Sequence, residues 1–218
     1  LIVLLIILLI TSVGRYADYW NKEKTRADLS NPIVYVTLGD SAAQGIGASS
    51  PQKGYVGLIG KRLDQEKNRP VHIINLSKSG AKIGDVLDTQ LPQLKDMKPD
   101  IITIEIGAND IASFNKDIFE KQSKELFERL PGNTVISDIP FFGGRSRFDP
   151  KQGENVLVAN TILQKFASEK SMQLVPLYEA TKRRNNYPWS YAIDYFHPND
   201  IGYQTWADVF WDRITSKI

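Results

Sequence analysis

The stretch Ile33-Val34-Tyr35-Val36-Thr37-Leu38-Gly39-Asp40-Ser41 decides the fold. Its first six residues are rich in β-branched side chains, which is typical of a buried strand, and a glycine ends the run just before an aspartate and a serine. Four similar short runs follow, at Val71–Leu76, Ile101–Ile106, Thr134–Ile139 and Met172–Pro176. We therefore predict five parallel strands.

Longer amphipathic segments separate these strands, as in βαβ units. They predict helices near Tyr55–Glu66, Ile83–Leu94, Ser113–Leu130, Glu154–Lys170 and Asn199–Ile214. The last carries apolar residues at helical spacing, which should pack on the sheet. The connection rules then give an α/β fold with an open, mostly parallel sheet, helices on both faces, and ligands at the carboxyl ends of the strands.

Ser41 follows the first predicted strand, where a nucleophile would belong. A serine nucleophile needs a base, and the base needs a carboxylate to orient it. Both occur in Asp194-Tyr195-Phe196-His197-Pro198, just before the last predicted helix. Asp194 is close enough in sequence to hold Nδ1 of His197, leaving Nε2 for Ser41. A serine after a strand, or an Asp-x-x-His sequence, is by itself more often part of a turn or a helix cap. The presence of both in one chain favours a catalytic triad.

Hydrolysis of an ester also needs donors for the oxyanion of the transition state. The ends of the second and third strands carry Ser79-Gly80-Ala81 and Gly107-Ala108-Asn109-Asp110. Gly80 offers its backbone N–H and Asn109 its side-chain amide. Each also has a structural explanation, Gly80 as a turn with positive φ and Asn109 as a helix cap, and these roles are compatible with catalysis.

In combination these blocks resemble the SGNH hydrolases, also called the GDSL esterase and lipase family. The matching blocks, in order, are Gly39-Asp40-Ser41, Gly80, Gly107-x-Asn109-Asp110 and Asp194-x-x-His197-Pro198. The resemblance implies a flavodoxin-like three-layer α/β/α fold, a triad of Ser41, His197 and Asp194, and an oxyanion hole from Ser41, Gly80 and Asn109. It implies a small acyl-ester substrate and no cofactor. Ala42 departs from the leucine in the family name, at a position that packs rather than reacts.

The composition excludes several other classes. There is no cysteine, so disulfides, thiolate metal sites and a cysteine nucleophile are excluded. The two histidines, His72 and His197, are too few for a histidine-rich metal centre, and His72 lies within a predicted strand, where it has no catalytic role. With 27 basic and 25 acidic residues the net charge is +2, which does not indicate a nucleic-acid partner.

Other functional classes fit only parts of the sequence. A nucleotide loop would use Gly45-Ile46-Gly47, but the third glycine of the fingerprint and the P-loop lysine are missing. A metallohydrolase would have to use Asp40, Asp194 and His197, a small ligand set, and we expect no metal. A binding module without activity would not need the complete catalytic set.

The substrate depends on loops, so several ester classes stay open. Lysophospholipids and short-chain esters are preferred, with thioesters and acetylated carbohydrates of the cell envelope as alternatives. Two segments are candidates for lining a substrate groove or for covering the core. They are Phe141-Phe142-Gly143-Gly144-Arg145 and the aromatic residues Tyr187, Trp189, Tyr191, Tyr195 and Phe196.

The chain opens on ten aliphatic residues, and its first charge is Arg15. Residues 1–14 are therefore predicted to be membrane-directed, with an uncut anchor slightly favoured over a signal peptide cut near Ser12-Val13-Gly14. As a helix they reach about 21 Å, short of a bilayer core of about 30 Å, and the initial leucine leads us to expect preceding residues. Residues 15–31 are predicted to be a flexible polar tether and residues 32–218 the catalytic domain. The enzyme would then lie outside the cytoplasm, anchored at the membrane surface or secreted.

Overall fold

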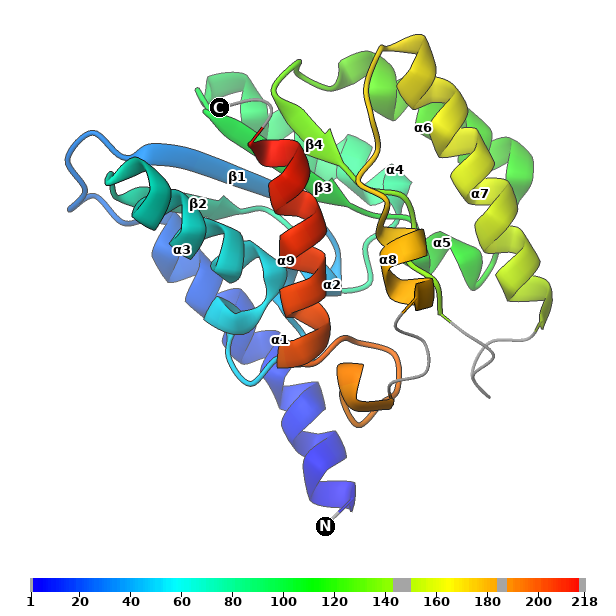
Figure 1. Ribbon diagram of the computed structural model, residues 1–218, viewed down its shortest axis with the longest axis horizontal. Coiled ribbons are helices and arrows are strands. Elements are labelled where there is room, and N and C mark those ends of the chain that lie inside the picture. Colours follow the sequence, from blue (N-terminus) through cyan, green and yellow to red (C-terminus); the bar gives the residue numbers. More distant parts are fainter. Residues whose placement is uncertain (1, 143–149, 184–187, 216–218) are drawn as a thin grey trace.

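A parallel sheet forms the centre of the molecule in the computed structural model, which describes residues 2–142, 150–183 and 188–215. Four strands pair in the order β2-β1-β3-β4 within the described residues (Figure 1). They are β1 (Ile33–Gly39), β2 (Val71–Asn75), β3 (Ile101–Glu105) and β4 (Thr134–Ile136). All three pairings are parallel, so the predicted α/β class is confirmed.

The predicted fifth strand, Met172–Pro176, is wrong over most of its length. A single parallel bridge joins Val175 to Ser137, with the Val175 N–H donating to the carbonyl of Ile136 at 2.9 Å. Pairing does not continue because helix α8 (Leu177–Arg183) begins two residues later, and the N–H of Leu177 turns back to the carbonyl of Val175 at 2.8 Å.

Four long helices confirm the amphipathic pattern, and one prediction needs correction. The confirmed helices are α3 (Tyr55–Lys67), α6 (Lys116–Arg129), α7 (Pro150–Glu169) and α9 (Asp200–Ile214). The segment predicted as one helix over Ile83–Leu94 is instead α4 (Ile83–Asp85) followed by two differently wound turns, Val86–Gln90 and Leu91–Asp96. Two further short helices, α2 (Ser41–Gln44) and α5 (Ala108–Ile111), begin directly after β1 and β3.

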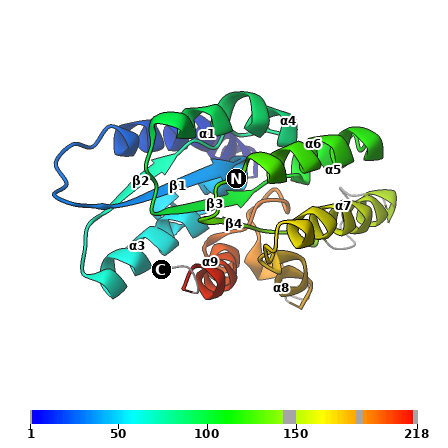
Figure 2. The ribbon, with the colours of Figure 1, turned by 90° about the horizontal axis from the view of Figure 1, so that it is seen from above.

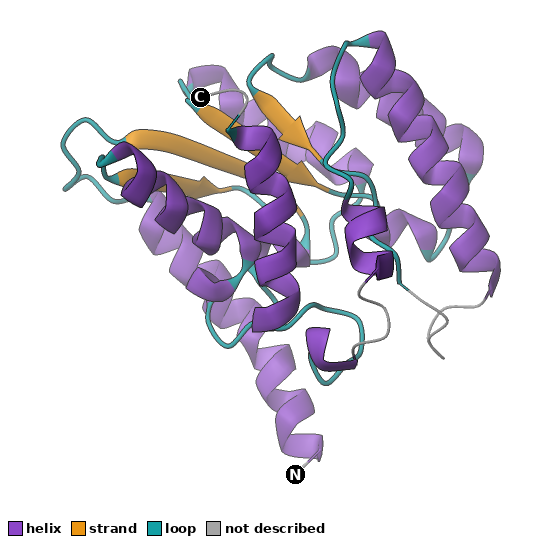
Figure 3. Cartoon of the chain, in the orientation of Figure 1, coloured by secondary structure: helices purple, strands orange, loops and turns teal. Residues whose placement is uncertain are grey.

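Helices cover both faces of the sheet (Figures 2 and 3), and each face has its own cluster of buried apolar side chains. On one face the strands pack against α6, α7 and the helical turns after residue 83, through side chains such as Ile104, Phe127 and Leu163. On the other face α3 and α9 pack against Tyr35, and Tyr55 stacks on Phe210 with ring centroids 4.9 Å apart. The result is the predicted three-layer arrangement.

Helix α1 (Ile2–Lys24) corrects the prediction of a flexible tether over residues 15–31. The helix continues without a break to Lys24, and its first turns extend beyond the body of the domain (Figure 1). Tyr16 and Trp20, one helical turn apart, are 6% and 2% exposed because they pack against the loop after β1. Tyr16 Oη donates to the carbonyl of Ala48 at 2.7 Å, and Trp20 Nε1 donates to the carbonyl of Gln44 at 2.9 Å.

The described helices include none with the length and apolar character needed to cross a membrane.

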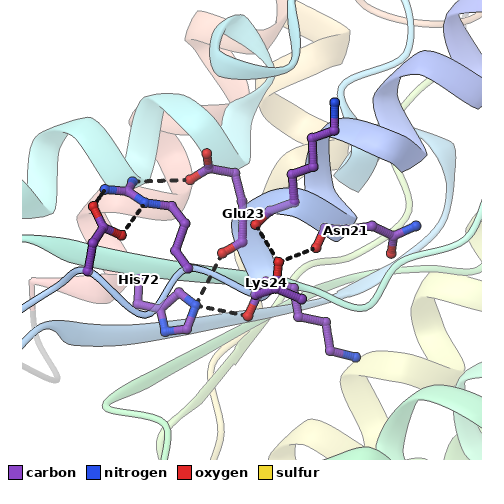
Figure 4. A network of polar contacts seen from close by, with 8 residues as sticks. Asn21, Glu23, Lys24 and His72 are labelled. Atoms are coloured by element: carbon purple, nitrogen blue, oxygen red, sulfur yellow. Dashed lines mark hydrogen bonds and ion pairs between the residues drawn. The ribbon is translucent and has the colours of Figure 1, made fainter.

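His72 joins the end of α1 to the edge strand β2 (Figure 4). Its Nε2–H faces the carbonyl oxygens of Glu23 and Lys24, at 3.2 and 3.1 Å. These carbonyls belong to the last turn of the helix, where the regular helical bonds end; the Glu23 carbonyl also accepts from the N–H of Arg26 at 3.2 Å. His72 is thus a structural strand residue, as predicted.

Candidate active site

The nucleophile loop is fixed by an unusually close approach of β1 to β3. Gly39 pairs with Glu105 and has φ +140°, and a Cβ at this position would lie 2.2 Å from the Glu105 carbonyl oxygen. Only glycine fits there. The side chain of Gln90 holds both backbone groups of Gly39, with each hydrogen bond 2.8 Å long. Ser41 therefore emerges from a rigid turn as the first residue of α2.

Ser41, His197 and Asp194 lie together as the sequence predicted. Nε2 of His197 is 2.9 Å from Oγ of Ser41, and Nδ1 is 2.5 Å from Oδ2 of Asp194. Ser41 is 5% exposed, so its hydroxyl is largely shielded from bulk water. This geometry lets Nε2 accept the serine proton while Nδ1–H donates to the carboxylate.

Asp194 is held in its charged form. Burial alone would raise its pKa, but the hydrogen bond and charge of His197, with the backbone N–H groups of Phe196 and His197, lower the pKa below the ordinary value. Those two N–H groups donate to Oδ1 at 3.0 and 3.1 Å. Because Oδ1 is fixed by the backbone, Oδ2 stays directed at the imidazole ring.

The nucleophile loop and the histidine loop are clamped together. Gly47 has φ +98°, and a Cβ there would lie 2.4 Å from the carbonyl oxygen of Pro198 and 2.7 Å from Cβ of His197. Asp200, at the start of α9, accepts from the backbone N–H and the hydroxyl of Ser49 at 2.7 and 2.8 Å. These contacts fix the separation between Ser41 and His197.

The predicted oxyanion donors lie beside Ser41, but they differ in availability. The backbone N–H groups of Ser41 and Gly80 donate to no acceptor within the described ranges. The side-chain amide of Asn109 instead donates to Oδ2 of Asp40 at 2.9 Å and to the carbonyl of Ala81 at 3.0 Å. Its role toward an oxyanion stays a prediction, since one of these bonds would have to be exchanged for it.

Asp40 has a structural role that the sequence motif did not reveal. It caps α2 by accepting from the N–H of Ala42 at 2.9 Å, and it orients Asn109. Burial raises the pKa of Asp40 to about 6, opposed by the Ala42 hydrogen bond and by His197. In the described part of the chain, no group of three or more His, Cys, Asp or Glu side chains is arranged to hold a metal ion.

A pocket with about 350 Å³ free of protein atoms opens beside Ser41 and His197. Both segments named from the sequence contribute to it, through Phe141 and Phe142 from one and Tyr191 and Phe196 from the other. Phe142 stacks on Phe196 at 5.4 Å, and Phe196 contacts the His197 ring edge-to-face at 4.8 Å. Trp189 and Tyr195 are instead exposed. Gly143, Gly144, Arg145 and Tyr187 lie outside the described residues.

Glu105 also lines this pocket, and sequence reasoning missed it. It is the last residue of β3, at 1% exposure, and neither carboxyl oxygen has a hydrogen-bond partner in the portion of the chain described. The available signal was a single charged residue inside the aliphatic run Ile101–Ile106. Glutamate is almost never fully buried in a protein unless it is paired.

Fold and site together have the arrangement of an α/β serine hydrolase. The GDSL-like Lipase/Acylhydrolase family matches residues 37–205, and the chain belongs to this family. The family description indicates hydrolysis of acyl groups as its chemistry.

Individual known proteins also resemble this chain, one in sequence and two in structure. "Spore germination lipase LipC" of Bacillus licheniformis is 31% identical over 98 residues, which is 43% of this chain and 45% of that protein, so the match spans less than half of the lipase. LAE5, an alpha/beta hydrolase enzyme from the metagenome of Lake Arreo, has a TM-score of 0.69 at 22% identity over 90% of this chain and 99% of its own. Axe2, an acetylxylan esterase from Geobacillus stearothermophilus, has a TM-score of 0.65 at 20% identity over 85% and 95%. The two structures support the fold.

Proposed function

We propose that the protein is a serine esterase that cleaves single acyl esters, with short acyl groups preferred over long ones. The observation that carries this is the triad at the mouth of a small aromatic pocket. The 350 Å³ includes open solvent at the mouth of the pocket, so the space enclosed by protein is smaller than that of most ligand sites. The Phe142–Phe196 stack forms one of its walls.

In this mechanism the Ser41 oxygen attacks the ester carbonyl while Nε2 of His197 takes the serine proton. The N–H groups of Ser41 and Gly80, joined by Asn109, stabilise the oxyanion. The protonated imidazole then gives its proton to the leaving alcohol, and an acyl-serine remains. Water, deprotonated by the same His197, releases the acid and restores the hydroxyl of Ser41.

Acetylated carbohydrate is the second candidate substrate. Acetyl is the smallest acyl group and fits the small pocket, and the fold resembles that of an acetylxylan esterase. Lysophospholipids, also predicted from the sequence, would require most of the acyl chain to lie outside the pocket.

The test is a substrate series. We expect kcat/KM to be highest for p-nitrophenyl esters of two to four carbons and to fall toward sixteen carbons, with lysophosphatidylcholine and acetylated xylose measured in parallel. Long-chain esters or lysophosphatidylcholine as the best substrates would contradict the short-chain preference and leave the triad unaffected.

We further propose that the apolar residues 1–14 hold the enzyme at a membrane surface outside the cytoplasm. The support is their composition and the continuous helix that links them to the domain. Co-flotation with phosphatidylglycerol vesicles tests this. We expect the full chain to float and a chain without residues 1–10 to remain in the dense fraction, whereas equal behaviour would contradict the proposal.

A further inference from the structure

Glu105 lines the pocket, and neither of its carboxyl oxygens has a hydrogen-bond partner among the described residues. In the β1–β3 register it stands opposite Gly39, two residues before the nucleophile. Ser41, His197 and Glu105 line the same pocket, whose other walls are mainly aromatic and apolar. A substrate acyl group attached to Ser41 would therefore share this space with the Glu105 carboxyl group.

A buried polar group without a hydrogen bond is costly, so its partner is expected to come from outside the protein. Neighbouring polar side chains on this face of the sheet do not supply one: Thr103, two residues earlier, bonds instead to Tyr35 at 2.8 Å and Thr37 at 3.1 Å. Both carboxyl oxygens are almost fully enclosed in the free protein, so a ligand oxygen reaches Glu105 only if the adjoining pocket widens.

The chemical state of Glu105 determines what it can bind. Burial raises the pKa of Glu105 well above its ordinary value, and the nearby Asp40 carboxylate raises it further. The raised pKa favours the neutral carboxyl group, which has one O–H donor and a carbonyl acceptor. Such a group pairs with a hydroxyl or a carbonyl oxygen and repels neither.

We propose that Glu105 is a specificity-determining residue, whose carboxyl group binds an oxygen on the second or third carbon of the substrate's acyl group. The preferred substrates are then esters of short hydroxy or oxo acids rather than of plain alkanoic acids. This inference rests on the proposed esterase function and narrows its substrate class. A plain alkyl group would leave the Glu105 carboxyl group unpaired, which is the situation in which polar sites discriminate strongly.

Matched ester pairs test this proposal. Hydrolysis of ethyl lactate against ethyl propionate, and of ethyl 3-hydroxybutyrate against ethyl butyrate, is followed by pH-stat titration. Each kcat/KM is divided by the hydroxide-catalysed rate of the same ester, which removes differences in intrinsic reactivity. We expect the hydroxy ester of at least one pair to be preferred by about tenfold to a hundredfold.

Variants assign the preference to the side chain. Glu105→Gln keeps a neutral donor and acceptor and should retain the preference, whereas Glu105→Leu, or Glu105→Met if the leucine variant does not fold, should lower the ratio by about tenfold or more. Thr103→Val is the matched control, because it removes a buried polar group from the same face of β3 outside the pocket lining. Its ratio should equal that of the wild type.

Two results overturn the proposal while the esterase function stands. One is a wild-type ratio near one for both pairs, and the other is an unchanged ratio in an active leucine or methionine variant. Failure of the proposed function looks different: the folded wild type would hydrolyse none of the four esters and would not react with a fluorophosphonate.

Discussion

At the scale of single residues, the backbone orients the Asp194 carboxylate toward His197, and His197 together with two backbone N–H groups keeps that carboxylate charged. Oδ1 of Asp194 accepts from two N–H groups of its own loop, so only Oδ2 is left for His197. The contacts within the loop of Asp194 and His197 thus fix the geometry of this pair. The rest of the fold only has to place the loop next to Ser41.

Ser41→Ala should remove activity without unfolding the protein. The alanine lacks the attacking oxygen, and loss of a serine nucleophile typically lowers kcat on the order of 10⁵ to 10⁶. The measurement is hydrolysis of p-nitrophenyl acetate together with fluorophosphonate labelling, with circular dichroism as the control for folding. Near-native turnover by a folded alanine variant would exclude the serine mechanism.

Asp194→Asn and Asn109→Ala separate two contributions to the rate. The asparagine favours the wrong imidazole tautomer, and we expect a loss on the order of 10⁴ in kcat. Removing the Asn109 amide should cost less, on the order of 10² to 10³. Steady-state kinetics on one short-chain ester compares them, and small, equal losses in both would place the active site elsewhere.

At the scale of elements, periodicity predicted which side chains face inward better than it predicted how the backbone winds. Residues from Ile83 to Leu94 present their apolar side chains to the core as a helix would. The winding nevertheless changes twice, since the buried side chain of Gln90 turns in to bind Gly39 and Pro92 lacks an N–H. The contact of Gln90 with Gly39 joins residues 51 positions apart and is not visible in a local pattern, whereas Pro92 can be read from the sequence.

Gly47→Ala tests the clamp between the two catalytic loops. The added methyl group would collide with the backbone of Pro198 and with His197, and φ +98° is itself unfavourable for alanine. We expect His197 to shift from Ser41 and kcat to fall on the order of 10².

Gly153→Ala is the control for this experiment. Its Cβ would meet no atom within 4 Å on α7, so activity should be native and stability slightly higher. If Gly47→Ala also keeps native kcat in the same assay, the close approach is not required for catalysis.

For the site, the order of four motifs was sufficient to predict the triad, because the carboxyl ends of parallel strands meet at one edge. The roles of Asp40 and Glu105 were not predictable in this way. They depend on burial and on what lies across the sheet, which a single sequence does not contain. The docking of α1 did leave a signal, since Tyr16, Tyr19 and Trp20 are unusual in a polar tether.

At the scale of the whole molecule, buried acids make stability depend on pH. Burial raises the pKa of Asp40 and Asp110 to about 6 and that of Asp138 to about 7. A carboxyl group with a raised folded pKa stabilises the native state most fully below its unfolded pKa, near 4, and this contribution is lost as pH rises through the folded pKa. We therefore expect stability to decline between about pH 4 and pH 7.

Asp138→Asn should reduce this decline. Asp138 accepts from the N–H of Tyr178 at 2.7 Å, and an asparagine oxygen retains that bond without the charge. The effect should be on the order of 2 kcal/mol between pH 5 and 8, or about 4–8 °C in Tm. Thermal unfolding at both pH values checks it, with the exposed Asp212→Asn as a control. A pH dependence identical to that of the wild type would argue against a neutral Asp138.

The docked helix α1 changes where the independently stable unit begins. Removing residues 1–31 as leader and tether would leave the carbonyls of Gln44 and Ala48 and the ring of His72 without their partners, a few residues from the nucleophile. It would also expose the apolar surface that Trp20 covers. A shortened protein intended for crystallisation or assay should therefore start at Thr11, which discards the aliphatic run and keeps the part of the helix that supports the catalytic loop.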